Sequence, residues 1–123
     1  MDAAMKVGII TIGNELLSGF TLDRNAAWIG QKLLSSGIKV NVHHTIPDDI
    51  GVIYDTLEYQ LKEWECDQII VTGGLGPTED DLTLDALAAV ANTTLHISEP
   101  LWNDILSRFP RLNHATQSNR RQA

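Results

Sequence analysis

The segment with the most evident chemistry in this 123-residue chain is a glycine-rich loop in its second half. The apolar, β-branched run 69–71 predicts a buried strand, and three of the four positions 73–76 shortly after it are glycine. Backbone N–H groups in such a loop, next to a helix N-terminus, bind phosphate and other anions. Gly73, Gly74 and Gly76 are therefore the first candidates for a phosphate-binding site.

Acidic residues directly after the loop change what this site can bind. Glu79, Asp80 and Asp81 lie where a phosphate would feel their negative charge. A divalent cation such as Mg²⁺ removes this conflict, because it binds carboxylate and phosphate oxygens together. The pattern therefore favours a metal-assisted nucleotide or phosphoester site. A purely structural interpretation stays open, because acids in a first helical turn are stabilising by about 0.3–1 kcal/mol each and Asp81 could serve only as a helix N-cap.

The composition indicates an acidic globular domain. Nine lysine and arginine residues against sixteen aspartates and glutamates give a formal net charge of −7, which disfavours contact with nucleic acid or anionic membranes. No apolar run approaches a membrane span, the N-terminus has no signal-peptide pattern, and the single Cys66 excludes an intrachain disulfide. We expect one cytoplasmic domain over residues 1–123, with apolar helix faces that are compatible with a homo-oligomer.

Strands and helices are predicted to alternate along the chain. Strands are predicted at 6–12, 39–45 and 68–72, with a weak short strand at 94–97. Helices are predicted from Asn25 to Gly37, around 53–64, around 84–92 and from Ser98 to Pro110, and a loop is predicted at 13–19. This alternation predicts βαβ units, a mostly parallel sheet and a three-layer α/β/α sandwich.

The loops that follow three parallel strands emerge at the same edge of a sheet. In this chain they carry Glu15 and Asn25, then Asp48 and Asp49, and then the glycine loop. We expect these polar groups to converge in one crevice. For Glu15, a turn residue that bonds nearby amides is an equally good interpretation, and asparagine at position 25 is more often a helix cap than a ligand contact. Arg24 is the only cation near these loops, and a solvated surface position is its default.

Five motifs, in order, resemble the molybdopterin-binding-like domain of the CinA (competence/damage-inducible protein A) family. They are 13–19 (GNELLSG), Asn25, 46–49 (IPDD), 72–83 (TGGLGPTEDDLT) and 118–123 (SNRRQA). The resemblance implies the fold of molybdopterin-binding and molybdopterin adenylyl-transfer domains. For the CinA branch it implies a metal-dependent pyrophosphatase that acts on ADP-ribose or on a related dinucleotide such as FAD.

The resemblance also implies roles for individual residues. Asp81 corresponds to the acid shared with the molybdopterin enzymes and Asp48 to their second important carboxylate, so both are candidate catalytic residues. Asp80 and Asp81, with Asp48 as the alternative partner, are the candidate ligands of a divalent metal ion, which we expect to be Mg²⁺. The candidate phosphate- and nucleotide-binding residues are Gly73, Gly74, Gly76, Thr78, Glu15 and Asn25.

Two features depart from the family pattern. Asn14 stands where threonine or aspartate is usual, and the family's domain normally continues past the motif at 118–123, so we expect a domain truncated at its C-terminal end. The amidase domain of longer family members is absent from this sequence, and its activity is not assigned. Two other functions would use the same loop and carboxylates. They are a molybdopterin-binding or adenylyl-transfer module of molybdenum cofactor biosynthesis, and a non-catalytic nucleotide-binding domain; in each case the ligand is a small-molecule nucleotide or pterin.

Overall fold

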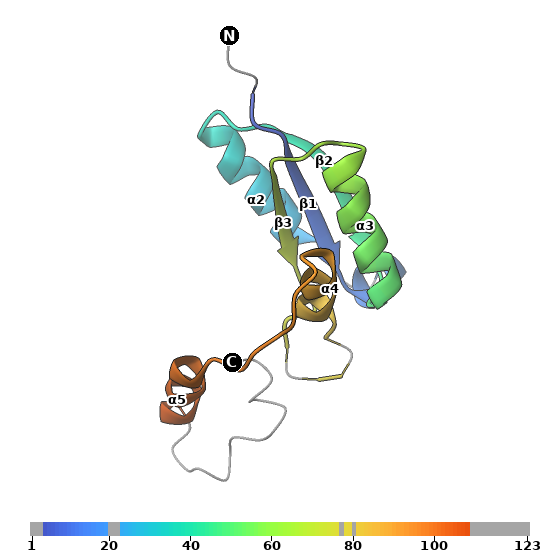
Figure 1. Ribbon diagram of the computed structural model, residues 1–123. Helices are drawn as coiled ribbons and strands as arrows, with labels where there is room; N and C mark the ends of the chain where they lie inside the picture. Colours follow the sequence, from blue (N-terminus) through green and yellow to red (C-terminus); the bar gives the residue numbers. More distant parts are fainter. Residues whose placement is uncertain (1–3, 20–22, 77, 80, 109–123) are drawn as a thin grey trace.

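A three-stranded parallel sheet forms the centre of the molecule (Figure 1). The computed structural model describes residues 4–19, 23–76, 78–79 and 81–108. The strands are β1 (Val7–Ile12), β2 (Val40–Ile46) and β3 (Gln68–Thr72), in the order β2-β1-β3. β1 is central and buried at all six positions, as its nearly continuous apolar run predicts.

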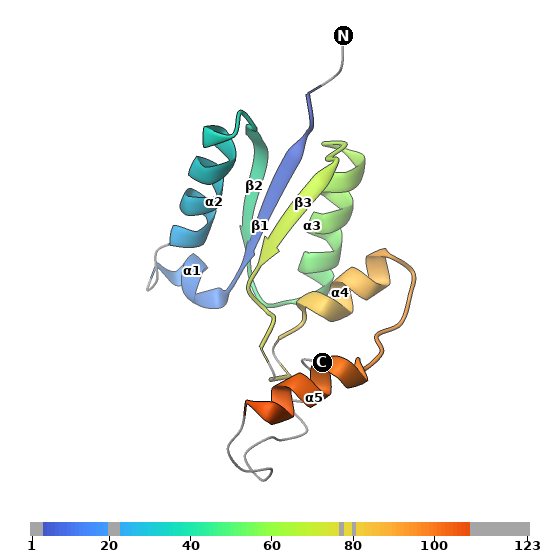
Figure 2. The same ribbon diagram turned by 90° about the vertical axis from the view of Figure 1, so that its left-hand side faces the viewer.

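Helices cover both faces of this sheet. The helices of the described residues are α1 (Asn14–Ser18), α2 (Arg24–Ser35), α3 (Ile50–Lys62), α4 (Thr83–Val90) and α5 (Glu99–Ser107). α2 lies on one face and α3 with α4 on the other, so the predicted three-layer α/β/α architecture is confirmed (Figure 2). α5 lies beyond the carboxyl edge of the sheet, apart from the three layers (Figures 1 and 2).

The main hydrophobic core lies between the sheet and the α3–α4 layer. Its buried members are Ile10, Ile12, Ile46, Ile53, Leu57 and Ala86. Because successive side chains of a strand point to opposite faces, Ile9 and Thr11 of β1 lie on the other side, toward α2. The central strand therefore supplies apolar side chains to both layers, which explains its complete burial.

The buried face of α3 differs from the one predicted. Ile53 and Leu57 are buried as expected, but Leu61 and Trp64, which the spacing places on the same face, are 41% and 39% exposed. Gln60 is fully buried instead, and its Nε2 donates to the Ile9 carbonyl oxygen at 3.1 Å. Hydrogen bonds to the central strand and to His44 Nδ1 satisfy the Gln60 Nε2 inside the core, whereas its buried Oε1 has no hydrogen-bond partner among the described residues.

The packed side of α4 also differs from the residues that indicate the helix in the sequence. Leu82, Ala86 and Val90 contact the core, whereas Leu84 and Leu87 are 40% and 36% exposed. Both sides of α4 are therefore apolar, and only one of them is covered by α3 and the sheet. Leu84, on the outward side, lines a cavity at the carboxyl edge of the sheet.

Three local predictions are wrong. The segment 13–19 contains the short helix α1, which ends at Gly19 with φ 80°, instead of being only a loop. α2 begins at Arg24 and is capped by Asp23, not by Asn25. The segment 94–97 pairs with no strand in the described part of the chain. Its residues Leu95, His96 and Ile97 instead line a pocket.

The last predicted helix is confirmed in its described part. Ser98 caps α5, with its hydroxyl oxygen accepting from the Leu101 amide at 3.4 Å. The expected stop at Pro110 and the motif at 118–123 lie outside the described residues. No helix within the described ranges has the length and apolar character needed to cross a membrane.

Candidate functional site

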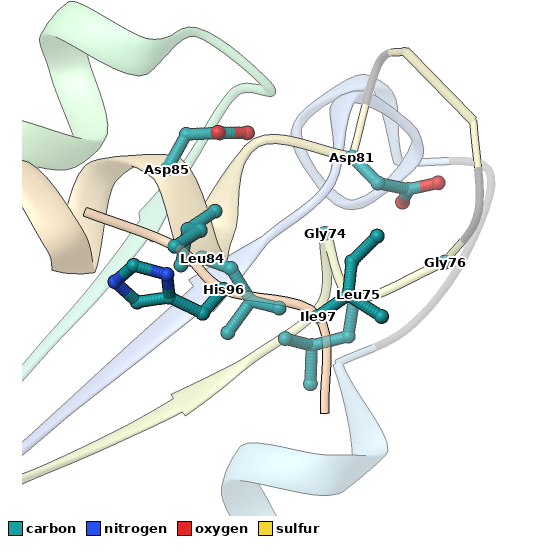
Figure 3. Close-up of a pocket in the computed structure, with 9 residues that line it drawn as sticks. Gly74, Leu75, Gly76, Asp81, Leu84, Asp85, His96 and Ile97 are labelled. Carbon is teal, nitrogen blue, oxygen red and sulfur yellow. The ribbon is translucent and has the colours of Figure 1, made fainter. Parts of the chain in front are cut away.

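Two cavities open at the carboxyl edge of the sheet, and the glycine loop lines both. The first, here called the switch-point cleft, has a volume of about 310 Å³ and includes Glu15, Arg24, Asn25 and Gly73. The second, here called the leucine pocket, has a volume of about 170 Å³ (Figure 3). It is lined by Gly74, Leu75, Gly76, Asp81, Leu84, Asp85, Leu95, His96 and Ile97.

The switch-point cleft lies where the fold predicts a ligand. The connections through α2 and α3 run on opposite faces of the sheet, so the loops after β1 and β3 diverge at its carboxyl edge. This divergence brings together three predicted site residues, Glu15, Asn25 and Gly73. Arg24 is exposed, as expected, and also lines the same cleft.

The structural interpretations of Glu15 and Asn25 do not hold. No hydrogen bond joins the Glu15 carboxylate to another described residue, and the short helix α1 has no side-chain cap. A Cβ added to Gly13 would lie 2.5 Å from Glu15 Oε1, which places this carboxylate directly over the end of β1. Asn25 is inside the first turn of α2 and does not cap it. Both side chains are therefore available to a ligand in the cleft.

The glycine loop can be built only with glycine at its first two positions. Gly73 and Gly74 have φ values of 90° and 65°, which favour glycine. A Cβ at Gly73 would lie 2.1 Å from the Ile12 carbonyl oxygen, and one at Gly74 would lie 2.2 Å from Thr83 Oγ1. Thr83 is buried, and its hydroxyl donates to the Gly73 carbonyl oxygen at 2.7 Å. The loop is therefore held against β1 and the start of α4.

Backbone amides of this loop remain available for an anion. Among the described residues, the N–H groups of Gly74, Leu75 and Gly76 donate no hydrogen bond. Thr83 occupies a carbonyl oxygen of the loop, not its amides. Such a row of unpaired donors before a helix is a known geometry for binding phosphate.

Asp81 braces the loop rather than capping α4. Its Oδ2 accepts from the Thr78 amide at 3.0 Å and from the Thr78 hydroxyl at 2.6 Å. α4 begins at Thr83 and its N-cap position, Leu82, makes no side-chain capping bond. Asp81 therefore holds the end of the loop in place with its carboxylate at the leucine pocket (Figure 3).

Asp48 is not among the lining residues of either cavity. It follows β2, and its backbone N–H donates to Asn14 Oδ1 at 3.1 Å, which ties the loop after β1 to the loop after β2. Threonine or aspartate at position 14 could supply the same acceptor, so the departure at Asn14 preserves this contact. Asp80 lies outside the described residues, and the described ones form no group of three or more potential metal ligands.

Asn14→Ala is expected to destabilise the protein by about 1 kcal/mol, because it leaves the Asp48 amide without its acceptor. Asn14→Asp keeps an acceptor oxygen and is the matched control, expected to remain close to the wild type. Urea denaturation followed by circular dichroism measures both free energies of unfolding. Equal stability of Asn14→Ala and the wild type would show that this contact does not hold the two loops together.

Asp23 is a residue of the cleft that the sequence analysis missed. Its Oδ1 accepts from the Ala26 amide at 3.1 Å, and its Oδ2 lies 3.4 Å from His43 Nε2. Burial alone raises the pKa of this carboxyl, but the nearby Thr11 hydroxyl, the hydrogen bond from the Ala26 amide and the attraction of His43 outweigh it, so the pKa lies below its usual value. The sequence feature that indicates this role is an aspartate directly before a helical pattern, a preferred helix N-cap.

Asp23→Asn is expected to flatten the dependence of stability on pH below about pH 4. Because the folded-state pKa is lowered, the carboxylate stabilises the folded protein above the unfolded pKa, and this contribution is lost as the pH falls through the folded pKa. Thermal unfolding between pH 7 and pH 2 tests this, with Asp55→Asn on the exposed side of α3 as control. A Tm that falls as steeply in Asp23→Asn as in the wild type would contradict the assignment.

The fold is an α/β domain with a glycine loop and two cavities at the switch point of a parallel sheet. Residues 8–121 match the family described as "probable molybdopterin binding domain". A CinA-like protein of Citrifermentans bemidjiense is 43% identical over 122 residues, covering 97% of this chain and 28% of that protein. One of Thermosipho melanesiensis is 39% identical over 111 residues, covering 90% and 27% respectively. The chain thus spans just over a quarter of these curated relatives.

Solved structures agree with these matches. The crystal structure of CinA from Thermoplasma acidophilum has a TM-score of 0.81 and 30% identity, with coverage of 94% of this chain and 67% of that one. The tungsten cofactor synthesizing protein MoaB from Pyrococcus furiosus has a TM-score of 0.64 at 23% identity, covering 87% and 66%, which shows the fold alone. The chain belongs to the molybdopterin-binding domain family, in its CinA-like branch.

Proposed function

We propose that this chain is a divalent-metal-dependent pyrophosphatase that hydrolyses ADP-ribose or a related dinucleotide such as FAD. The observation that carries the proposal is the glycine loop, which lines both cavities and whose Gly74, Leu75 and Gly76 amides donate no hydrogen bond to another described residue. A diphosphate bound there has a cavity on either side for the two halves of a dinucleotide. Membership of the CinA-like branch supports the same class of ligand.

The loop amides bind and stabilise the negatively charged substrate. The amides of Gly74, Leu75 and Gly76 provide hydrogen-bond donors to phosphate oxygens, and they are preorganised because Gly73 and Gly74 pack against β1 and Thr83. Fixed donors that meet charge as it develops on a phosphoryl oxygen are an effective source of transition-state stabilisation. Arg24 adds a positive charge on the cleft side of the loop.

The carboxylates fit a hard divalent ion. Asp81 Oδ2 lies so close to the loop that a Cβ on Gly76 would be 2.6 Å from it, which places an anionic oxygen beside the proposed phosphate position. Mg²⁺ is usually held by one or two carboxylates together with substrate phosphates and water, so a larger cluster of side-chain ligands is not needed. Asp81 with Asp80 would hold the ion; Asp48, the alternative partner expected from the sequence, lines neither cavity. When bound, it would polarise the phosphoryl group and activate a water molecule.

The remaining polar residues of the cleft orient the substrate and water. Glu15 lies over the end of β1 without a hydrogen-bond partner among the described residues, so its carboxylate can accept a hydrogen bond from an attacking water. Asn25 offers an amide donor and acceptor at the cleft wall, suited to the hydroxyl groups of a ribose. In this proposal Glu15 positions water and Asn25 positions the sugar.

The test is hydrolysis of ADP-ribose by the purified protein with Mg²⁺. Attack of water on the diphosphate yields AMP and ribose 5-phosphate, and the same reaction on FAD yields AMP and FMN. Chromatography of the products after incubation with and without EDTA measures both. Metal-dependent AMP release supports the proposal, whereas binding of ADP-ribose without turnover would make the chain a non-catalytic nucleotide-binding domain.

A second candidate is a molybdopterin-binding or adenylyl-transfer module. The shared fold with MoaB of Pyrococcus furiosus favours it, although at 23% identity that likeness concerns the fold alone. The same loop and carboxylates would then bind molybdopterin and ATP. Incubation with both and Mg²⁺ distinguishes the two functions, because adenylylated molybdopterin and pyrophosphate form only in the second.

A further inference from the structure

A cluster of polar side chains joins the start of α2 to the face of the sheet that this helix covers (Figure 2). Thr11 of β1 lies opposite Thr45 in the parallel register with β2, and His43 is two residues before Thr45 on the same face. His43 Nε2 lies 3.2 Å from the Thr11 hydroxyl and 3.4 Å from the Thr45 hydroxyl. Asp23, directly before α2, places its Oδ2 3.4 Å from the same nitrogen. These four residues, here called the Asp23–His43 cluster, therefore connect a helix N-terminus to two strands.

The two carboxylate oxygens of Asp23 have different surroundings. Oδ1 caps α2 by accepting from the Ala26 amide at 3.1 Å. Oδ2 is buried and accepts no hydrogen bond from another described residue, which is unfavourable for a carboxylate unless a donor or a positive charge lies close to it. His43 Nε2 is in that position. Because an ionised carboxylate only accepts hydrogen bonds and a hydroxyl can do either, this arrangement favours a proton on Nε2 that faces Asp23.

Packing alone fixes the start of α2 only weakly. Every residue of α2 is described, and only Ala26 is buried. Behind Asp23, between α2 and the sheet, is a cavity of about 300 Å³ whose walls include Ile9, Gly30 and His43. Asp23 lines this cavity on one side and the switch-point cleft on the other. A helix end with an open space behind it and little buried apolar surface depends on its polar contacts for its position.

The two residues that follow Asp23 are those that α2 contributes to the switch-point cleft. Arg24 and Asn25 line the cleft from the first turn of α2, so a shift of Asp23 moves both of them. His43 does not line the cleft. An effect of His43 on a ligand in the cleft therefore passes through Asp23 and the first turn of α2.

We propose that His43 is a positioning residue of the switch-point cleft. It holds Asp23 by its Nε2, and the capped first turn of α2 then presents Arg24 and Asn25 to the substrate in a fixed arrangement. This inference rests on the proposed function, because it requires part of the dinucleotide to enter this cleft. Loss of the His43 contact is expected to weaken substrate binding and to leave the chemical step nearly intact, since the glycine loop and Asp81 lie outside α2.

His43→Leu and His43→Gln test the role by steady-state hydrolysis of ADP-ribose with Mg²⁺. Leucine fills similar space without a donor, and we expect KM to rise about tenfold. We expect kcat to stay within about twofold of the wild type, which is the pattern for a loss of ground-state binding. Glutamine offers an amide N–H to Asp23 and is the matched control, expected to restore most of the affinity. The His43 side chain is 38% exposed, so neither substitution disrupts a sealed core. Thermal unfolding verifies that both variants fold.

Two further measurements separate this role from a general loss of stability. Hydrogen exchange of the Ala26 amide, followed by NMR, is expected to be faster in His43→Leu and as slow as in the wild type in His43→Gln, because this amide donates to Asp23. When His43→Leu is added to Asp23→Asn, we expect no further rise in KM, since His43 acts through Asp23.

The outcomes separate the positioning role from the proposed function. An unchanged KM in folded His43→Leu would overturn the positioning role, as would equal effects of leucine and glutamine on KM. Absence of ADP-ribose hydrolysis in the wild type would overturn the proposed function, and calorimetric titration with ADP-ribose then decides the role of His43, with affinity in place of KM. If the wild type did not bind ADP-ribose either, both would be overturned.

Discussion

Asp81→Asn is expected to lower the rate of ADP-ribose hydrolysis by at least about 100-fold, while the melting temperature stays within a few degrees of the wild type. Asparagine retains an oxygen that can accept from Thr78, so the bracing of the loop survives. It removes the negative charge that would hold the proposed metal ion. Metal ions contribute several kcal/mol of transition-state stabilisation, and every 1.36 kcal/mol is tenfold in rate.

Thr78→Val is the matched control for this prediction. It removes the 2.6 Å hydrogen bond from the Thr78 hydroxyl to Asp81 but leaves the Asp81 charge in place. We expect a loss in stability of about 1 kcal/mol and a much smaller loss in rate than in Asp81→Asn. Steady-state kinetics over a range of Mg²⁺ concentrations compares the two. If Asp81→Asn stayed active and only its melting temperature fell, Asp81 would be a structural brace and not a metal ligand.

Gly73→Ala is expected to cost about 2–5 kcal/mol of stability and to abolish nucleotide binding. The left-handed conformation accounts for about 1–2 kcal/mol. The remainder, about 1–3 kcal/mol, comes from a Cβ that would lie 2.1 Å from the Ile12 carbonyl oxygen. That oxygen belongs to the backbone of the central strand and cannot move aside cheaply. Relief of the clash must therefore displace the loop and the amides proposed to bind phosphate.

Gly37→Ala separates backbone strain from the clash. Gly37 has φ 80°, close to the 90° of Gly73, but a Cβ there meets no atom within 4 Å. We expect a cost of only about 1–2 kcal/mol and unchanged AMP binding, because Gly37 is at the C-terminal end of α2, outside both cavities. Urea denaturation and calorimetry give both quantities. Equal costs for the two variants would mean that the loop at Gly73 adapts without loss.

The contrast between Glu15 and Asp48 shows how far the sequence can place site residues. Both follow strands of one parallel sheet, so both were expected at the same edge in a single crevice. The structure divides that edge into two cavities on either side of the glycine loop, with Glu15 in the first and Asp81 in the second. Asp48 lines neither, because its loop turns toward α3 and is joined to Asn14. The order of strands is not encoded in the local pattern of any one loop.

Which face of a helix is buried is also beyond what the sequence can predict, because it depends on packing against other elements. Periodicity indicates that 53–64 is helical, but Gln60 is buried and Leu61 is exposed, because the choice depends on which atoms of β1 lie opposite. Likewise, the outward leucines of α4 look like core residues in the sequence. Only the position of α3 shows that Leu84 and Leu87 stay outside the core, where Leu84 lines a pocket.

The sequence by itself determined the alternation of strands and helices, the glycine loop and the family. These depend on local patterns, namely apolar periodicity, residues that adopt φ above zero and motif order. The tertiary structure alone decided that Asp81 braces the loop, that Arg24 and Asp23 line the cleft, and that four exposed aliphatic side chains form a pocket. Those features depend on contacts between segments distant in the chain, which no local pattern specifies.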